Sequence, residues 1–429
     1  MNLDISIDGV WHPCATINPA TDGPAATRRS PVRLQYDADY ATEHLNARDY
    51  RALTVRAPVD LGIRALPCWP SFLVDLLPQG AARRRIERLG DGAFTEWQLL
   101  ERGAINPVGN LRVHPPNAVV QPKHNGFELS EMIPRGDAFV DFAYEVGATV
   151  AGATDTQGEA PKFWVVEDQQ GRWHPDSGAL GFPVRRYALL KFPVPEAGPR
   201  AAEILRHEAA YQRVAQRLGL RVTNSLPEFI DGALLIPRFD RRWENDAEVR
   251  LGVESLYSVA GVLNSTTTSL RHHDALVALA SCTTDFDTEI VEYTRRDLLN
   301  LALGNRDNHG RNTAVLKETD GTMRLAPIYD CGPAFLDARA IVRVMHWDGE
   351  QPGRTDWSLV LDNLATRFEE AHVETRAWPA LIESMQRFAE ELNHLPAIMA
   401  DCAVDKPIID RRASEIERLK RELREIRLP

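Results

Sequence analysis

Hydrophobic and polar positions alternate along the chain with two different periods, and the period changes between its two ends. Residues 3–7 and 32–36 alternate apolar and polar side chains, the period of two that predicts strands with one buried face. Beyond residue 347 the apolar positions recur every three or four residues, which predicts amphipathic helices. The pattern therefore predicts sheet first and helices last, and the fold class is α+β, or α/β in the wider sense.

The middle of the chain carries both patterns. Short apolar runs at residues 163–166 and 187–190 predict buried strands. Residues 200–218 repeat apolar positions at helical spacing up to a glycine that can cap the helix. Asp231-Gly232 separates two apolar runs, which predicts a two-residue hairpin.

The densest group of chemically active residues lies further on, around Asp307. Asn312 stands five positions after Asp307 and a strand-like run follows, which is the D-x-x-x-x-N spacing of a kinase catalytic loop. In such loops the aspartate takes the proton of the attacking hydroxyl, and the asparagine binds a magnesium ion at the phosphates of ATP. A second hairpin, from the strand at 313–316 to the strand at 323–326, leads to Asp330, which begins Asp-Cys-Gly where kinases place the other magnesium ligand. The alternative is a capped turn, in which Asp307 and Asn312 bond only to local backbone.

The composition of the chain narrows the classes of protein to which it can belong. With 44% hydrophobic residues, 26% charged residues and a net charge of −11, the chain is typical of a globular protein without a basic footprint, so we expect no direct nucleic-acid contact. Its five cysteines are far apart and predict neither a zinc site nor a disulfide framework. No apolar run reaches the roughly 18 residues that cross a membrane, and there is no signal-peptide pattern, which predicts a cytoplasmic protein without a membrane segment.

The residues around Asp307 resemble the HipA-like serine/threonine kinases, the toxins of bacterial type II toxin–antitoxin pairs. Their loop follows the pattern G-N-x-D-x-H-x-x-N and is followed by P-x-Y-D. The matching positions are Gly304, Asn305, Asp307, His309, Asn312, Pro327, Tyr329 and Asp330. The resemblance implies catalytic roles for Asn305 and His309 beside Asp307, with His309 supporting the loop through a backbone carbonyl or Asp330.

The resemblance extends over nearly the whole chain and implies a protein-kinase-like, two-lobed fold in three parts. Residues 1–115 are expected to form a HipA-type N-terminal subdomain. Residues 116–245 are expected to form the nucleotide-binding lobe, and residues 246–429 the helical lobe with the catalytic loop.

A stretch rich in Gly, Ala and Thr before residue 162 resembles the phosphate loop of this family, although it can also be an ordinary surface turn. Small residues let a backbone come close to phosphate. The positions assigned to the nucleotide are Gly152, Thr154, Thr156, Gly158 and Lys162. Relatives carry an autophosphorylated serine where this chain has Asp155. Phosphorylation is therefore predicted at Thr154 or Thr156, at Thr149 under a shifted alignment, or not at all if Asp155 mimics phosphate.

Further nucleotide contacts are predicted on the strands and the helix that follow. Lys191 ends an apolar strand, and a lysine in that setting needs a carboxylate or phosphate partner unless it snorkels at a strand edge. The carboxylate is assigned to Glu208, on a helix that resembles the family's counterpart of kinase helix C. The segment P-R-F-D resembles the family's hinge, which implies adenine contacts at Pro237, Phe239 and Asp240.

These residues predict an ATP- and magnesium-dependent serine/threonine protein kinase. The resemblance implies a protein substrate, since relatives phosphorylate aminoacyl-tRNA synthetases, and a small helix-turn-helix antitoxin as partner. Three alternatives stay open: a pseudokinase that acts as a corepressor with the antitoxin, a kinase of small molecules or lipids, and a purely structural protein.

Four local predictions complete the picture. Asp297 is expected to begin the helix that enters the catalytic loop. His272 and His273 are expected to form an exposed pair, and residues 254–269 a mobile segment like a kinase activation loop. Residues 414–427 carry an apolar stripe and are expected to form a docking helix, with binding of a partner as the alternative.

Overall fold

The computed structural model describes residues 1–20, 27–78, 83, 86–87, 94–115, 124–134, 139, 143, 162–178, 180–193, 199–263, 270–338, 340–351 and 353–426. It divides into two compact units. Unit 1 comprises Met1–Pro195, Glu228–Leu263 and Leu316–Thr322. Unit 2 comprises Glu196–Pro227, Asn264–Val315 and Met323–Pro429, so the chain passes from one unit to the other several times.

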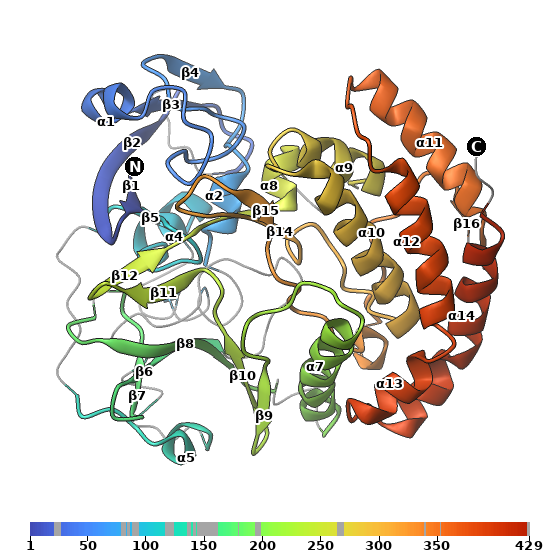
Figure 1. Cartoon of the computed structure of the whole chain (residues 1–429). Helices are drawn as coiled ribbons and strands as arrows, with labels where there is room; N and C mark the ends of the chain where they lie inside the picture. The colour runs from blue at the N-terminus through green and yellow to red at the C-terminus, as the bar shows by residue number, and fades with distance from the viewer. Residues whose placement is uncertain are drawn as a thin grey trace. The chain divides into compact units, whose positions relative to one another are not determined.

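Unit 1 begins with a five-stranded antiparallel sheet in the order β4-β3-β2-β1-β5 (Figure 1). Its strands are β1 (Asn2–Ile7), β2 (Val10–Pro19), β3 (Val32–Tyr36), β4 (Ile63–Leu66) and β5 (Leu111–Val113). Buried and exposed side chains alternate strictly along β3. The period-two pattern therefore predicted β3 correctly, and it predicted where β1 lies but not its burial, because Asp4 and Ser6 of β1 are buried too.

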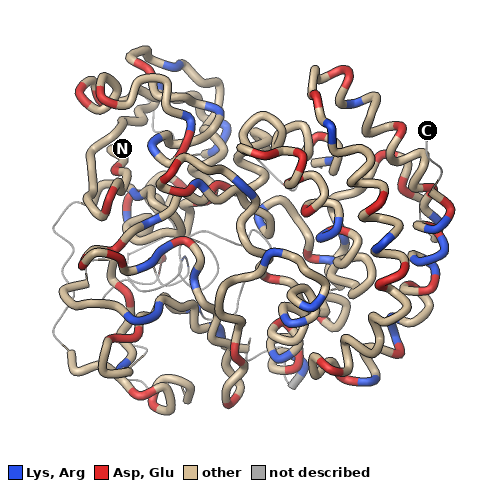
Figure 2. Tube along the Cα trace, in the orientation of Figure 1, with Lys and Arg blue, Asp and Glu red and all other residues tan. Residues whose placement is uncertain are grey.

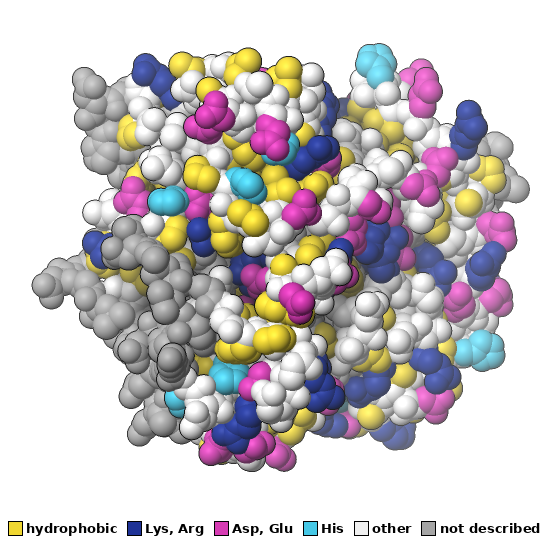
Figure 3. Space-filling view, turned by 60° about the vertical axis from the view of Figure 1, so that its left-hand side comes forward, with side chains coloured by type: hydrophobic (Ala, Val, Ile, Leu, Met, Phe, Trp, Pro, Cys, Tyr) yellow, Lys and Arg dark blue, Asp and Glu magenta, His cyan; other side chains and the backbone are white. Residues whose placement is uncertain are grey.

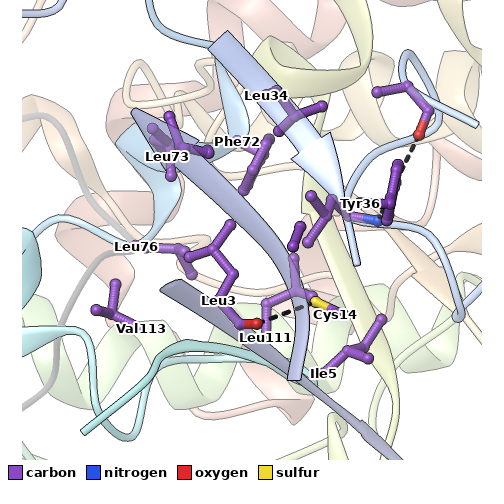
Figure 4. Close-up of a cluster of buried hydrophobic side chains, with 14 of the residues drawn as sticks. Leu3, Ile5, Cys14, Leu34, Tyr36, Phe72, Leu73, Leu76, Leu111 and Val113 are labelled. Carbon is purple, nitrogen blue, oxygen red and sulfur yellow. Dashed lines mark hydrogen bonds between the residues drawn. The ribbon is translucent and has the colours of Figure 1, made fainter. Parts of the chain in front are cut away.

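The buried face of this sheet forms a hydrophobic core with helix α2 (Phe72–Asp75), shown in Figure 4. Leu3, Ile5 and Leu34 are almost completely buried, and burying each such side chain stabilises the fold by about 1.5–3 kcal/mol. The hydroxyl of Tyr36 satisfies its polarity inside this core by donating to the carbonyl of Ala57 at 2.7 Å. The other helices of this region are α1 (Ala38–Glu43) and α4 (Glu96–Gly103).

A second antiparallel sheet in unit 1 has the order β7-β6-β8-β10-β9. Its strands are β6 (Lys162–Asp168), β7 (Trp173–Pro175), β8 (Val184–Lys191), β9 (Glu228–Ile230) and β10 (Ala233–Pro237). The hairpin between β9 and β10 turns at Asp231 and Gly232, whose φ angles of 47° and 96° are the left-handed values that a two-residue turn requires. Unit 1 also contains α5 (Leu129–Met132), β11 (Arg241–Glu244), β12 (Ala247–Arg250), β13 (Gly252–Ser255) and α8 (Leu256–Ala260).

Unit 2 is mainly helical. Its elements are α7 (Pro199–Arg217), α9 (His272–Ala280), α10 (Phe286–Leu303), η2 (Ala334–Leu336), β16 (Glu350–Gln351), β17 (Arg354–Thr355), α11 (Trp357–Glu370), α12 (Trp378–Glu391), α13 (Leu395–Asp401) and α14 (Lys406–Arg424). Helices α10, α12 and α14 pack against one another (Figure 1). The buried Ile416, Leu419 and Leu423 confirm that the last helix docks. It begins earlier than predicted, because Asp405 stands at its N-cap and a proline lies in its first turn.

The predicted hairpin after the catalytic loop is present, with strands β14 (Ala314–Lys317) and β15 (Met323–Leu325). The N–H of Glu318 donates to the carbonyl of Thr322 at 2.8 Å next to the turn. The N–H of Ala326 donates to the carbonyl of Ala314 at 2.8 Å at the other end. The two strands thus return the chain from the loop to the Asp-Cys-Gly segment.

Three local predictions are wrong. Helix α10 begins after the N-cap Asp285, so Asp297 lies buried within the helix instead of at its start. His272 and His273 are 1% and 0% exposed, because α9 turns both rings into the core of unit 2. Glu254 belongs to β13 and is 2% exposed, so the start of the segment predicted to be mobile is part of the packed structure. Residues 264–269 of that segment lie outside the described residues.

Charged residues of both signs are interspersed along the trace (Figure 2), and on the face shown in Figure 3 they lie among exposed hydrophobic side chains. The five cysteines are free thiols. Among the described helices, none combines the length and apolar character needed to cross a membrane.

Candidate active site

Helix α10 leads directly into the loop at residues 304–312, and Gly304 ends the helix. Its φ of 74° is a left-handed value that favours glycine. A Cβ at this position would lie 2.9 Å from Cδ1 of Phe335 and 3.0 Å from Cζ of Arg412, so a larger residue would have to displace these side chains. Arg412 itself donates to the carbonyls of residues 302 and 301, at 3.0 and 2.8 Å, and so satisfies the last turn of the helix.

Two asparagine side chains hold the backbone around Asp307. Asn305 accepts a hydrogen bond from the Asp307 N–H at 3.3 Å and donates to Oδ1 of Asn300 at 3.0 Å. Asn312 donates from Nδ2 to the Asp307 carbonyl at 2.7 Å, as the capped-turn alternative predicts. That bond uses only the nitrogen. The Oδ1 atom of Asn312 is buried and has no hydrogen-bond partner among the described residues, which is costly unless a ligand or cation completes it.

The ring of His309 faces the carboxylate of Asp307. Its Nε2 lies 3.6 Å from Asp307 Oδ1, and its Nδ1 accepts the N–H of Arg311 at 3.2 Å. Because Nδ1 accepts, the ring proton lies on Nε2 and points toward the carboxylate. The His309 side chain is 3% exposed and that of Asp307 is 21% exposed, so the histidine supports from inside an aspartate that solvent can reach. The predicted partner of His309 was a backbone carbonyl or Asp330, and the sequence did not indicate Asp307.

Asp330 lies near the loop because neighbouring residues are bonded. The hydroxyl of Tyr329 donates to the carbonyl of Arg311 at 2.6 Å, which ties the residue before Asp330 to the residue before Asn312. Asp330 has a φ of 52°, a left-handed conformation that aspartate tolerates better than most residues and that is typical of functional sites. The structure therefore brings Asn312 and Asp330 into one neighbourhood of unit 2, as the hairpin predicted.

Helix α7 places Glu208 beside the same segment. The Glu208 side chain is 4% exposed, and its Cβ would lie 3.7 Å from a Cβ built on Gly332. Burial raises the pKa of the Cys331 thiol to about 12, and the nearby Glu208 and Asp330 carboxylates add to that shift. Gln212, one turn further along α7, donates to the carbonyl of Ile328 at 2.9 Å and fixes the helix against the segment.

Unit 1 holds the two predicted phosphate-binding lysines on adjacent strands. Lys162 of β6 and Lys191 of β8 are direct partners in the antiparallel register. Direct partners point to the same face of a sheet, with Cβ atoms about 4.5–5.5 Å apart. Like charges in that arrangement repel each other, so the pair suits a polyanionic ligand. The predicted pairing of Lys191 with Glu208 would join residues of the two units and stays a prediction.

The same face of this sheet continues as an apolar surface toward the predicted hinge. Strand alternation places Trp164 and Leu189 on the lysine side, and the register places Ile236 opposite Leu189. Pro237 ends β10 opposite Ala188. One sheet face thus carries lysines at one end and the hinge-like segment at the other.

Asp240 is the one predicted hinge residue whose side chain lies within an ionic cluster. Its carboxylate accepts from Arg238 at 2.8 and 2.6 Å, from Arg241 at 3.3 Å, and from the Gly109 N–H at 2.9 Å. Burial alone would raise the pKa of Asp240, and the two guanidinium groups lower it well below its usual range. The Arg238 guanidinium also lies 3.7 Å from the centre of the Trp164 ring. Asp240 therefore fixes the backbone of the hinge-like segment, which includes Phe239, and a direct nucleotide contact by its side chain stays a prediction.

Part of the predicted nucleotide site lies outside the described residues. Lys162 is the first residue after it that the structure describes. The predicted positions in that part are Thr149, Gly152, Thr154, Asp155, Thr156 and Gly158.

Sequence reasoning missed three residues that bear on the loop. Asn308 of the loop donates to the buried Asp297, which also binds Arg343. A signal for Asp297 was present, because apolar positions at helical spacing already begin at Ile290, seven residues before the aspartate. Nothing in the sequence pattern links Arg343 to the loop.

A comparison with protein families supports the resemblance. The family model described as HipA-like C-terminal domain matches residues 154–395, more than half of the chain. A protein of Sinorhizobium fredii (strain NBRC 101917 / NGR234) with the name "Putative kinase Y4mE" is 28% identical over 163 residues. That alignment covers 36% of this chain and 38% of the relative, well under two thirds of its length.

A solved structure of a HipA protein shows a similar fold. HipA of Shewanella oneidensis MR-1, in a complex with HipB and its operator DNA, matches with a TM-score of 0.68 at 18% identity, covering 99% of this chain and 100% of that chain. The proinflammatory kinase CtkA of Helicobacter pylori matches with a TM-score of 0.36 at 15% identity, covering 58% of this chain and 94% of that one. The likeness to HipA confirms the predicted α+β fold.

Proposed function

The chain belongs to the family of proteins with a HipA-like C-terminal domain, and from this premise we propose that it is a magnesium-dependent kinase that transfers the γ-phosphoryl group of ATP to a serine or threonine of a protein. The observation that carries the proposal is the buried Oδ1 of Asn312, which has no hydrogen-bond partner among the described residues and lies five positions after Asp307. Kinase loops place a magnesium ligand at this spacing.

The donor set fits magnesium. Asn312 offers an amide oxygen and Asp330 a carboxylate, and Mg²⁺ prefers oxygen ligands of these two kinds. The bond from Asn312 Nδ2 to the Asp307 carbonyl fixes the amide so that its oxygen is the free end. When bound there, the ion would neutralise charge on the phosphates of ATP.

Asp307 is the residue that we expect to take the proton of the attacking hydroxyl. Its carboxylate is partly exposed, so a substrate side chain can reach it, and the Nε2–H of His309 faces it at 3.6 Å. Asn305 fixes the Asp307 backbone from one side and Asn312 from the other. The catalytic role predicted for Asn305 is thereby specified as a positioning role, because both ends of its amide are engaged.

We assign the phosphates of ATP to Lys162 and Lys191 and the adenine ring to the face that carries Leu189 and Ile236. Two lysines that are register partners on one face of the sheet suit a polyanion, and charge-assisted hydrogen bonds to phosphate are stronger than neutral ones. The backbone at Pro237 and Phe239 supplies polar groups at the far end of this face. Gly152, Thr154, Thr156 and Gly158 complete the proposed phosphate site.

The proposed binding partner and substrate are inferred from similar proteins. HipA of Shewanella oneidensis was solved with HipB and operator DNA, so we propose an antitoxin partner of the helix-turn-helix kind for this chain. The net charge of −11 favours a partner that supplies the DNA contact. The proposed substrate is a cellular protein, with aminoacyl-tRNA synthetases as the first candidates.

Titration calorimetry and ATP turnover by the full chain test the proposal. Asn312→Ala should weaken Mg-ATP binding at least tenfold and remove turnover, whereas the exposed Asn393→Ala should change neither. Unchanged Mg-ATP affinity in Asn312→Ala would overturn the metal assignment. Phosphate that appears on small molecules but on no protein would replace the proposal with the small-molecule alternative.

A further inference from the structure

A buried carboxylate inside helix α10 connects three segments of unit 2. Asp297 is 2% exposed. Its Oδ1 accepts from Nδ2 of Asn308 at 2.8 Å, and its Oδ2 accepts from Arg343 at 2.8 Å and from Nε1 of Trp347 at 2.7 Å. His272 lies close by, with Nε2 at 3.5 Å from Oδ1. The contacts come from three parts of the sequence: the segment with Arg343 and Trp347, His272 of α9, and the loop that carries Asp307.

Asn308 is the link to that loop. It follows Asp307 directly and is 9% exposed, with its amide turned inward to the helix. Since Asn305, Asn308 and Asn312 bind three different points, the backbone that carries Asp307 is fixed from three directions. Of these anchors, Asn308 alone binds an ionised group, and hydrogen bonds to charged groups are the stronger kind.

Arg343 is the link to the chain that follows the metal-binding acid. It lies between Val342 and Val344, which are 73% and 39% exposed, while its guanidinium reaches inward. There it also pairs with Glu350 and donates to Nε2 of His272 at 3.1 Å. Arg343 therefore anchors this segment to the interior of unit 2, while the apolar side chains of its neighbours Val342 and Val344 are exposed.

We propose that Asp297 is a positioning residue, which holds the loop of Asp307 through Asn308 and couples that loop to the segment around Arg343. The proposal rests on the proposed kinase function and deepens it. A displacement of about 1 Å in a reacting group can cost on the order of a hundredfold in rate. The anchor of the loop should therefore act on the chemical step more than on nucleotide binding.

The charge of Asp297 alone does not make it special, since the same helix carries another buried carboxylate. Glu289 is 2% exposed and binds Arg221 at 2.8 Å and the Leu325 N–H at 2.9 Å. Those contacts join α10 to other parts of unit 2 and include no residue of the loop. Asp297 differs because one of its three partners is the residue next to the proposed base.

Two variants that each remove one donor to Asp297 test the proposal. Asn308→Ala removes the bond to the loop, and Trp347→Phe removes a bond at the opposite side of the same carboxylate. In ATP turnover, Asn308→Ala should lower kcat at least tenfold with the KM for ATP within twofold. Trp347→Phe should keep kcat within threefold, even where its melting temperature falls as far or further. A fall in kcat of equal size in both variants would overturn the positioning role.

A charge exchange provides the rescue. Asn308→Asp places a second carboxylate against Asp297 and should lower kcat more than Asn308→Ala does. Asp297→Asn combined with Asn308→Asp restores a carboxylate–amide pair and should recover part of the loss. If the double variant is no better than Asn308→Asp alone, the direct link between the two residues is contradicted.

Hydrogen exchange separates this inference from the kinase proposal. Peptides that cover residues 304–313 should exchange at least tenfold faster in Asn308→Ala and at the wild-type rate in Trp347→Phe. If the wild type turns over no ATP but the exchange pattern holds, the kinase proposal fails and the anchor stands. Unchanged exchange in Asn308→Ala would overturn the anchor whatever the turnover.

Discussion

Each unit of the protein contains a buried carboxylate on which distant parts of the sequence converge, and the two differ in what they hold. In unit 1, Glu254 binds Nζ of Lys317 at 2.8 Å, the Val55 N–H at 3.0 Å and the hydroxyl of Thr54. In unit 2, Asp297 binds the loop next to Asp307. Both side chains are 2% exposed. Burial and hydrogen bonding are alike, so neither feature alone indicates which carboxylate affects chemistry.

The difference teaches that a buried ionic group gains a function from the segments it joins. Glu254 joins a loop of the N-terminal region to β13 and β14 and so holds unit 1 together. Asp297 joins two helices to a loop that carries a partly exposed carboxylate and an amide oxygen without a hydrogen-bond partner among the described residues. Variants that remove the charge of Glu254 or of Asp297 should therefore differ: the first should affect stability alone, and the second should also affect turnover.

We refer to the buried carboxylates of Glu254 and Asp297 as the hubs of unit 1 and unit 2. The largest effect is expected from removing the carboxylate of Asp307, which precedes Asn308, the loop residue bound to the hub of unit 2. Asp307→Asn keeps the size of the side chain but cannot accept a proton, so turnover should fall about 100- to 10,000-fold. Mg-ATP affinity measured by calorimetry should stay within about threefold, because the proposed metal ligands are intact. Asp320→Asn, in the exposed turn of the hairpin, is the matched control and should keep full activity. Full turnover in Asp307→Asn would place the base elsewhere.

The next effect concerns the hubs themselves. Glu254→Gln leaves the buried ammonium of Lys317 without its carboxylate, which should lower the free energy of unfolding by about 3–5 kcal/mol. Asp297→Asn should cost less, because Arg343 keeps Glu350 as a second carboxylate partner. Urea denaturation measures both, and turnover per folded molecule should fall only in Asp297→Asn. If Glu254→Gln lowers turnover per folded molecule equally, the distinction between the hubs is wrong.

The sequence predicted those parts of the site that depend on local spacing. Asp307 and Asn312 lie on one loop, and Asp330 follows the hairpin that begins after it, so counting residues was enough to place them near one another. Gly304 was recognised by its place in the motif, and its φ of 74° supplies the physical reason. The α+β fold also followed from the change of hydrophobic period.

The parts that could not be predicted depend on long-range packing. Asp297 was placed at a helix start because aspartate favours N-caps, and only the packed structure shows it buried within α10. Arg343 lies 46 positions from its partner Asp297. The Asp240 cluster joins residues of the P-R-F-D segment to Gly109, 131 positions away. Sequence periodicity carries no information about such pairs.

A third prediction compares the lysines of unit 1 with the loop of unit 2. Lys191→Met and Lys162→Met should each weaken ATP binding by about 10- to 100-fold, since hydrogen bonds to charged groups contribute about 1.5–3 kcal/mol. Lys191 is the more buried of the two and should show the larger loss. Loop exchange should stay at the wild-type rate in both. Lys420→Met on α14 is the control, and unchanged ATP affinity in Lys191→Met would contradict the phosphate assignment.

The smallest effect is a difference in acid sensitivity between the two hubs, and it depends on His272. Burial lowers the pKa of His272 from 6.5 to about 3, the Asp297 carboxylate opposes that shift, and Arg343, His273 and His346 add to it. The unfolded chain therefore binds a proton between pH 6.5 and 3 that the folded chain does not. As the pH falls through that window, this difference should lower the free energy of unfolding by up to about 1.4 kcal/mol per pH unit.

Glu254 behaves differently. Burial alone would raise its pKa, but Lys317 lowers it below 4.5, so its contribution is lost only as the pH falls below that value. Between pH 6.5 and 5 the hub of unit 2 should thus weaken while the hub of unit 1 does not. Urea denaturation of wild type and His272→Gln at pH 6.5 and 5.5 measures this, because glutamine can still accept from Arg343 but does not titrate. The variant should lose less stability than wild type by about 1 kcal/mol over that step, because the histidine of the unfolded chain is already half protonated at pH 6.5. Equal losses would show that His272 already carries its proton in the folded protein, and that Asp297 then holds a charged ring as well as the loop.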